Sequence, residues 1–86
     1  MGDSLLRECG KARRWFETMA HDDGCAGVER ELGDAIISGS HRQLVAAATS
    51  AINWWDEFLR QNADDPMQQG LGVMRNDLAA AIWRSS

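Results

Sequence analysis

Residues 40–62 read SHRQLVAAATSAINWWDEFLRQN, and this stretch decides the fold. Its first four residues match a capping box, in which the hydroxyl of Ser40 accepts a backbone N–H and Gln43 reaches back to the start of the helix. The apolar residues that follow are spaced three and four apart and form one broad arc: Leu44, Val45, Ala48, Ala51, Ile52, Trp55, Phe58 and Leu59. The sequence therefore predicts an amphipathic helix over residues 41–62.

A second helix-start signal lies just downstream. Asp65 stands at a predicted N-cap, Pro66 at the first helical position and Gln68 at the third, which is favourable chemistry for beginning a helix. The apolar residues beyond it follow spacings of four, three, four and three, like the seam between bundle helices: Met67, Leu71, Met74, Leu78 and Ala81. We expect a helix over residues 66–84.

The upstream half of the chain predicts two further helices, over residues 4–20 and 24–38. Their apolar stripes contain Leu5, Cys9, Ala12, Phe16 and Met19 in the first, and Cys25, Val28, Leu32, Ala35 and Ile36 in the second. Gly39 is placed to end the second helix. Short connections join antiparallel neighbours, so the prediction is an all-α, up-down-up-down four-helix bundle. An irregular array with steeper helix crossings is the alternative.

Composition limits the domain count and the class of partner. With 86 residues, the chain suits a single domain over residues 1–86. A net charge of −4 makes nucleic acid an unlikely partner, because binding to phosphates depends on cationic side chains. Charged residues interrupt the apolar stretches, so no membrane segment is expected and the location is predicted to be cytoplasmic. Cys9 and Cys25 fit buried, reduced thiols.

No pattern in the sequence points to catalysis. His21 and His41 are the only histidines, and neither has a nucleophile at a recognisable motif spacing. His21 falls in a turn, where capping explains it better than metal binding, and His41 is expected in solvent. The sequence therefore predicts a non-enzyme with no catalytic residue, no metal site and no cofactor.

A short basic stripe runs along the first predicted helix, opposite its apolar side. Arg7, Lys11 and Arg14 share one line at helical spacing. The stripe fits a solvated face. If it is functional, it would meet an acidic patch on a partner or a phosphate.

The helix predicted over residues 66–84 has a second face that is unusually poor in charge. Placing residues at 100° intervals puts the following residues on it: Gly72, Val73, Asn76, Ala79, Ala80 and Trp83. One explanation is that this helix is the central helix of the domain, covered on both sides by the other three. The other is a partner interface, in which small residues allow close approach and Trp83 anchors the contact. Trp54, at the edge of the arc on the preceding helix, is the remaining candidate interface residue.

These surfaces predict a small non-enzymatic protein-binding module. The expected class is a bacterial or phage inhibitor, immunity protein or regulatory protein that occludes its partner through the C-terminal helix. The partner is a protein of unknown identity, and a homodimer is possible on this pattern. A homo-oligomeric structural protein is one alternative.

A further alternative comes from residues 74–81, MRNDLAAA. Arg75 and Asn76 resemble the Arg-Asn-x-x-x-His stretch of the HEPN superfamily of helical ribonucleases and their inactive relatives. The resemblance implies a helical bundle that pairs its motif helices across a dimer. Ala80 stands where that family keeps its catalytic histidine, so the resemblance implies a degenerate subunit.

Overall fold

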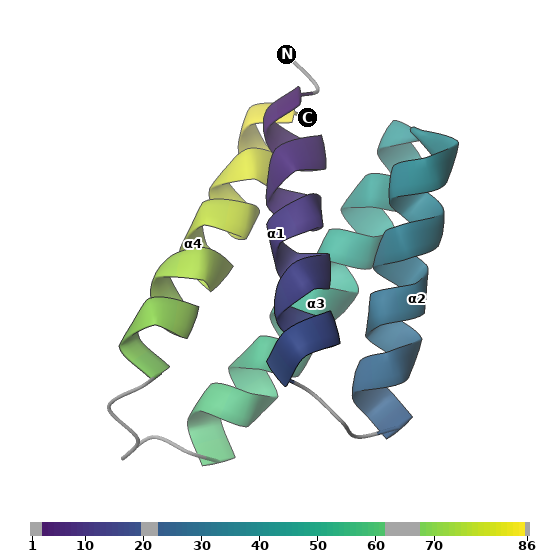
Figure 1. Ribbon diagram of the computed structural model, residues 1–86. Coiled ribbons are helices and arrows are strands. Elements are labelled where there is room, and N and C mark those ends of the chain that lie inside the picture. The colour runs from purple at the N-terminus through teal and green to yellow at the C-terminus, as the bar shows by residue number, and fades with distance from the viewer. Residues whose placement is uncertain (1–2, 20–22, 62–67, 86) are drawn as a thin grey trace.

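The computed structural model describes residues 3–19, 23–61 and 68–85, and all but the two residues of one turn are helical (Figure 1). The helices are α1 (Asp3–Met19), α2 (Asp23–Ser38), α3 (His41–Gln61) and α4 (Gln68–Ser85). Successive helices run in opposite directions, so the predicted all-α, up-down-up-down bundle is confirmed. No helix in the described ranges is long and apolar enough to cross a membrane.

The turn between α2 and α3 shows how the sequence sets a helix boundary. Gly39 adopts a φ of 69°, and its N–H donates to the carbonyl of Ala35 at 3.0 Å, which is the left-handed C-cap that glycine favours. The start of α3 at His41 is confirmed. The predicted capping-box bonds of Ser40 and Gln43 do not form in this fully described turn. The hydroxyl of Ser38 accepts the N–H of Ser40 at 3.2 Å instead. The predicted cap at Asp65 lies outside the described residues.

All four helices contribute to one apolar core. The buried members are Leu5, Cys9, Ala12 and Phe16 from α1, and Cys25, Leu32 and Ala35 from α2. The other two helices supply Leu44, Ala47, Ala48, Ala51, Ile52 and Trp55 from α3, and Leu71, Leu78 and Ala81 from α4. The two cysteines are buried and not disulfide-bonded, as predicted. Burial raises the pKa of the Cys9 thiol to about 11, with a smaller contribution from the nearby charge of Glu8. Sγ of Cys9 lies 3.8 Å from the carbonyl oxygen of Leu44, so the protonated thiol also links α1 to α3.

An aromatic cluster occupies the contact between α1 and α3. Its members are Trp15, Phe16, Trp54, Trp55 and Phe58, with ring centroids 5.0 to 6.1 Å apart. Trp55 is fully buried and stacks on Phe16 at 5.4 Å, whereas Trp15 and Trp54 are half-buried. Aromatic pairs at these distances stabilise the fold beyond the area they bury.

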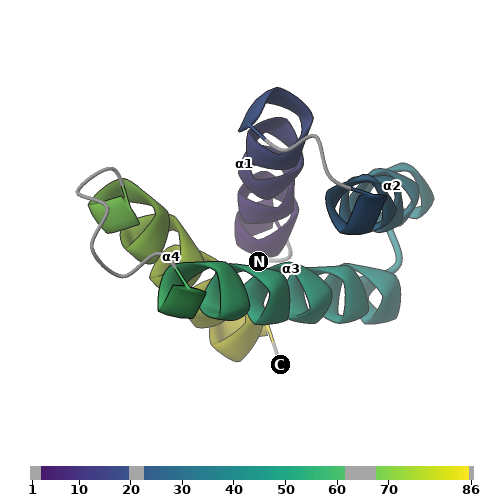
Figure 2. The ribbon, with the colours of Figure 1, turned by 90° about the horizontal axis from the view of Figure 1, so that it is seen from below.

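The helices are arranged so that α2 and α4 lie on opposite sides of α1 (Figures 1 and 2). Each neighbouring pair in the order α1, α2, α3, α4 is in contact, α1 also contacts α4 and α3, and α2 does not contact α4. Figure 2 shows α3 running obliquely beneath α1. The explanation that α4 is the central helix, covered on both sides, is therefore wrong: α4 is an edge helix that packs only on α1 and α3.

This arrangement gives a flattened molecule. Its principal extents are 36 × 25 × 16 Å, and its accessible surface is 5705 Å². A monomer of 9.5 kDa has an accessible surface of roughly 5,000 Å² by the usual scaling with mass. The accessible surface is thus somewhat above that average, as expected for a flattened shape.

Candidate protein-interaction surface

We call the six predicted residues of α4 the α4 outer face: Gly72, Val73, Asn76, Ala79, Ala80 and Trp83. Val73, Asn76 and Trp83 point into solvent, whereas Ala79 packs against the edge of the core. The exposed Asp77 and Arg84 share the solvent side of α4 with Val73. Trp83 is 81% exposed and Val73 61% exposed. Asn76 is exposed as well, and the glycine and both alanines are half-buried. Half of the predicted face, Val73, Asn76 and Trp83, is therefore exposed in the folded chain.

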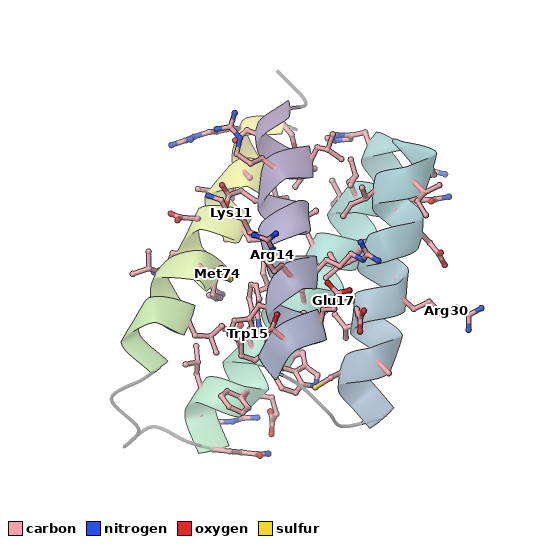
Figure 3. The ribbon with its side chains drawn as sticks, viewed as in Figure 1. Lys11, Arg14, Trp15, Glu17, Arg30 and Met74 are labelled. Atoms are coloured by element: carbon pink, nitrogen blue, oxygen red, sulfur yellow. The ribbon has the colours of Figure 1, made fainter. Side chains whose placement is uncertain are left out.

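The seam on the opposite side of α4 explains why this face points outward. Leu71, Leu78 and Ala81 are at most 5% exposed, and Met74 packs partly buried against the core. Figure 3 shows Met74 on the α1 side of α4. Because these four residues fill the inner side, the helical period turns Trp83 and Asn76 away from the core. The seam predicted from sequence is thus confirmed from Leu71 to Ala81, and Met67 lies outside the described residues.

The orientation of α4 about its own axis is further fixed by an ion pair with α3. Nε of Arg75 lies 2.8 Å from Oδ1 of Asp56, and Nη2 lies 3.2 Å from Oδ2. The hydrogen bond to Asp56 raises the pKa of the guanidinium, opposed in part by desolvation, so Arg75 stays protonated. Arg75 also donates to Oδ1 of Asn76 at 3.3 Å. The six residues of the α4 outer face are uncharged, and the exposed Asp77 and Arg84 border them.

Gly72 is not required by the packing of the chain. A methyl group at this position would meet no atom within 4 Å outside its own stretch of helix, because the position opens into solvent. Glycine in a helix interior is unfavourable by about 1 kcal/mol relative to alanine. Gly72 therefore costs stability while leaving a notch beside the exposed Val73.

Trp54, the remaining candidate, is placed differently. It lies in the aromatic cluster, stacked on Phe58 at 5.2 Å and 5.3 Å from the ring of Phe16. The structure thus turns Trp54 toward α1, away from the α4 outer face. A partner contact at Trp54 stays a prediction, because its remaining exposed edge would belong to a separate surface.

The Arg-Asn string of α4 has a structural explanation. The guanidinium of Arg75 is held by Asp56, and Ala80 lies half-buried on the outer face. In the described part of the chain, no three His, Cys, Asp or Glu side chains gather where they could hold a metal ion. His41 is exposed, as expected, and His21 lies outside the described residues.

Two features of the α1 and α2 surface were missed from sequence. Ile37 is 85% exposed, and Gly33 is buried against the side chain of Arg13. The sequence did contain a signal for Gly33, because a glycine inside a predicted helix often has a packing reason. The signal for Ile37 was absent, since its neighbour Ile36 satisfies the same apolar stripe.

Comparisons with protein-family models, with curated proteins and with solved structures each found no significant match.

Proposed function

We propose that this chain is a non-enzymatic protein-binding module that binds a partner protein through the α4 outer face. The observation that carries the proposal is the 81% exposure of Trp83 on a face whose own six residues are uncharged and which Asp77 and Arg84 border. Tryptophan is enriched among the residues that dominate binding energy, and charged residues are depleted from interface centres. A solvated helix face normally carries lysine, glutamate and arginine.

Small residues on the α4 outer face support the same proposal. Gly72 and Ala80 would let a partner backbone approach α4 closely, while Asn76 offers an amide between them. Val73, 61% exposed, provides a second apolar contact about three turns of helix from Trp83. The apolar ends and the polar centre of the α4 outer face together fit a helix of the partner lying along α4.

Binding would act by occlusion: α4 covers part of the partner and excludes whatever that part otherwise binds. This mode of action suits a small inhibitor, immunity protein or regulatory protein.

The proposal is tested with two matched surface variants, Trp83→Asp and Ile37→Asp. Both replace a large apolar side chain that is more than four-fifths exposed, one on α4 and the other on α2. Tagged wild-type chain and both variants are used for capture from the source cell. We expect Trp83→Asp to lose the captured protein and Ile37→Asp to retain it.

Sedimentation of the purified chain tests whether the partner is a second copy. Concentration-dependent dimers that disappear in Trp83→Asp would identify a homodimer built on the α4 outer face. If the wild-type chain neither self-associates nor captures a protein that Trp83→Asp loses, the proposal is wrong. Circular dichroism of each variant shows that a loss of binding is not a loss of fold.

A further inference from the structure

A surface hollow of about 450 Å³ lies over the contact between α1 and α2, on the far side of α1 from α4. Its lining residues are Gly10, Lys11, Arg13, Arg14, Glu17 and Ile36. Three cationic side chains thus face one carboxylate, on a chain whose net charge is −4. Figure 3 shows Glu17 between α1 and α2 and Arg14 on the front of α1. The basic stripe expected from sequence therefore borders a concave site.

Arg13, which does not belong to that stripe, lines both this hollow and a neighbouring one. Its side chain crosses α2 at Gly33, a residue of the neighbouring hollow, where an added Cβ would lie 3.2 Å from Nε and 3.7 Å from Cζ. A methyl group there would require the Arg13 side chain to shift slightly. Within the described part of the chain, no carboxylate lies in ion-pair distance of Arg13 or Arg14, whereas Lys11 is paired with Glu8 at 3.2 Å. Two guanidinium groups therefore line the hollow with their hydrogen-bond donors available.

We propose that this hollow binds a small organic anion, whose phosphate or carboxylate group is held by Arg13 and Arg14 while its apolar part rests on Ile36. The planar guanidinium group matches both oxyanions and donates two parallel hydrogen bonds. Lys11 adds positive charge at the rim. A volume of 450 Å³ lies within the range of small-molecule sites.

A neighbouring hollow of about 320 Å³ shares Arg13 but has a different charge. Arg13 and Arg30 line it together with Glu29 and Asp34, so its cations and carboxylates balance. Arg30 extends from α2 away from the molecule (Figure 3). The excess positive charge therefore belongs to the first hollow, and the anion is assigned there.

The test is a titration of the ¹⁵N-labelled chain by NMR, with arginine Nε–Hε resonances observed directly. The probes are phenyl phosphate, benzoate and the neutral benzyl alcohol. We expect saturable shifts at Arg13 and Arg14 with at least one of the two anions, and none with the alcohol. A response to phenyl phosphate alone would identify a phosphate ligand, and an equal response to benzoate would include carboxylates. No saturable shift with either anion, or equal shifts with the alcohol, would overturn the proposal.

Glycine variants supply the structural control. Gly33→Ala displaces the Arg13 side chain slightly, whereas Gly27→Ala, in the same helix, adds a methyl group with no atom within 4 Å. Both substitutions improve helix propensity, so both chains should fold. We expect Arg13→Gln to weaken anion binding by roughly tenfold, the loss of about one charge-assisted hydrogen bond, Gly33→Ala to weaken it less, and Gly27→Ala to leave it unchanged. Equal affinity in all four chains would refute the role of Arg13.

Because the hollow is remote from α4, Trp83→Asp should bind the anion normally, which separates this site from the proposed partner surface.

Discussion

Arg75 and Asp56 join α4 to α3 through two hydrogen bonds, of 2.8 and 3.2 Å, between side chains 19 residues apart in sequence. Among the described residues, the other two ion pairs, of Lys11 with Glu8 and of Arg60 with Glu57, link residues within one helix. The pair therefore gives the edge helix a polar contact with the bundle in addition to its apolar seam. Its effect is on the orientation of α4, and hence on where Trp83 points.

Replacing Asp56 with Asn should weaken this attachment. Asp56 is 48% and Arg75 31% exposed, so the pair contributes at most about 1 kcal/mol to the free energy of unfolding, less at high salt. The sharper readout is amide hydrogen exchange, which should become faster along α4. Glu57→Gln, which removes a pair confined to α3, is the control and should leave α4 unchanged. Equal exchange in α4 for both variants would show that the Arg75 contact does not hold the helix.

The two tryptophans Trp55 and Trp83 should differ strongly in their contribution to stability. Trp55 is fully buried, and Trp83 is 81% exposed. Trp55→Ala removes the centre of the aromatic cluster and should lower the free energy of unfolding by about 3–5 kcal/mol. This is a large share of the total stability of a small domain. Trp83→Ala should change the free energy of unfolding by no more than about 0.5 kcal/mol. Urea denaturation followed by circular dichroism measures both, and a large cost at Trp83 would mean that this residue supports the fold.

The sequence predicted the helices and the core because both depend on local period and capping chemistry. Gly39 ends α2 by a backbone conformation that its residue type favours, and Leu71 and Leu78 show their inward position by spacing alone. Two kinds of fact were not local. The edge position of α4 depends on which helices pair in space, and no periodicity distinguishes an edge helix from a central one. The contact of Arg13 with Gly33 depends on where α1 and α2 cross. The position of Trp54 against α1 likewise depends on how α1 packs on α3.

The raised pKa of Cys9 predicts a loss of stability at high pH. The thiol ionises near pH 9 in the unfolded chain and near 11 in the folded one, so the folded state binds more protons between these values. The stabilisation is full below pH 9 and is lost as the pH rises through about 11, by a total of roughly 2–3 kcal/mol. Urea unfolding at pH 8 and pH 10.5 under reducing conditions measures the effect. Cys9→Ala should show a smaller decline, and an identical decline would assign it to other groups.

Gly72 and Gly70 provide the most direct test of why α4 has a bare face. A methyl group at either position meets no atom within 4 Å in the chain, so alanine should be tolerated at both. Helix propensity alone predicts that each substitution raises the free energy of unfolding, by up to about 1 kcal/mol, with the smaller gain at Gly70 because it lies in the first turn of α4. Thermal or urea unfolding of the isolated chain checks this part.

Binding should then separate the two glycines. Gly72 belongs to the α4 outer face, and Gly70, two residues earlier, lies about 160° from Gly72 around the helix, at the border of the face beside Val73. If a partner backbone packs close to Gly72, Gly72→Ala should weaken the complex while stabilising the free chain, and Gly70→Ala should weaken it less. A gain in stability accompanied by a larger loss of binding at Gly72 than at Gly70 would show that the glycine is kept for contact with the partner. Unchanged affinity in Gly72→Ala would move the contact away from this end of α4, toward Asn76 and Trp83.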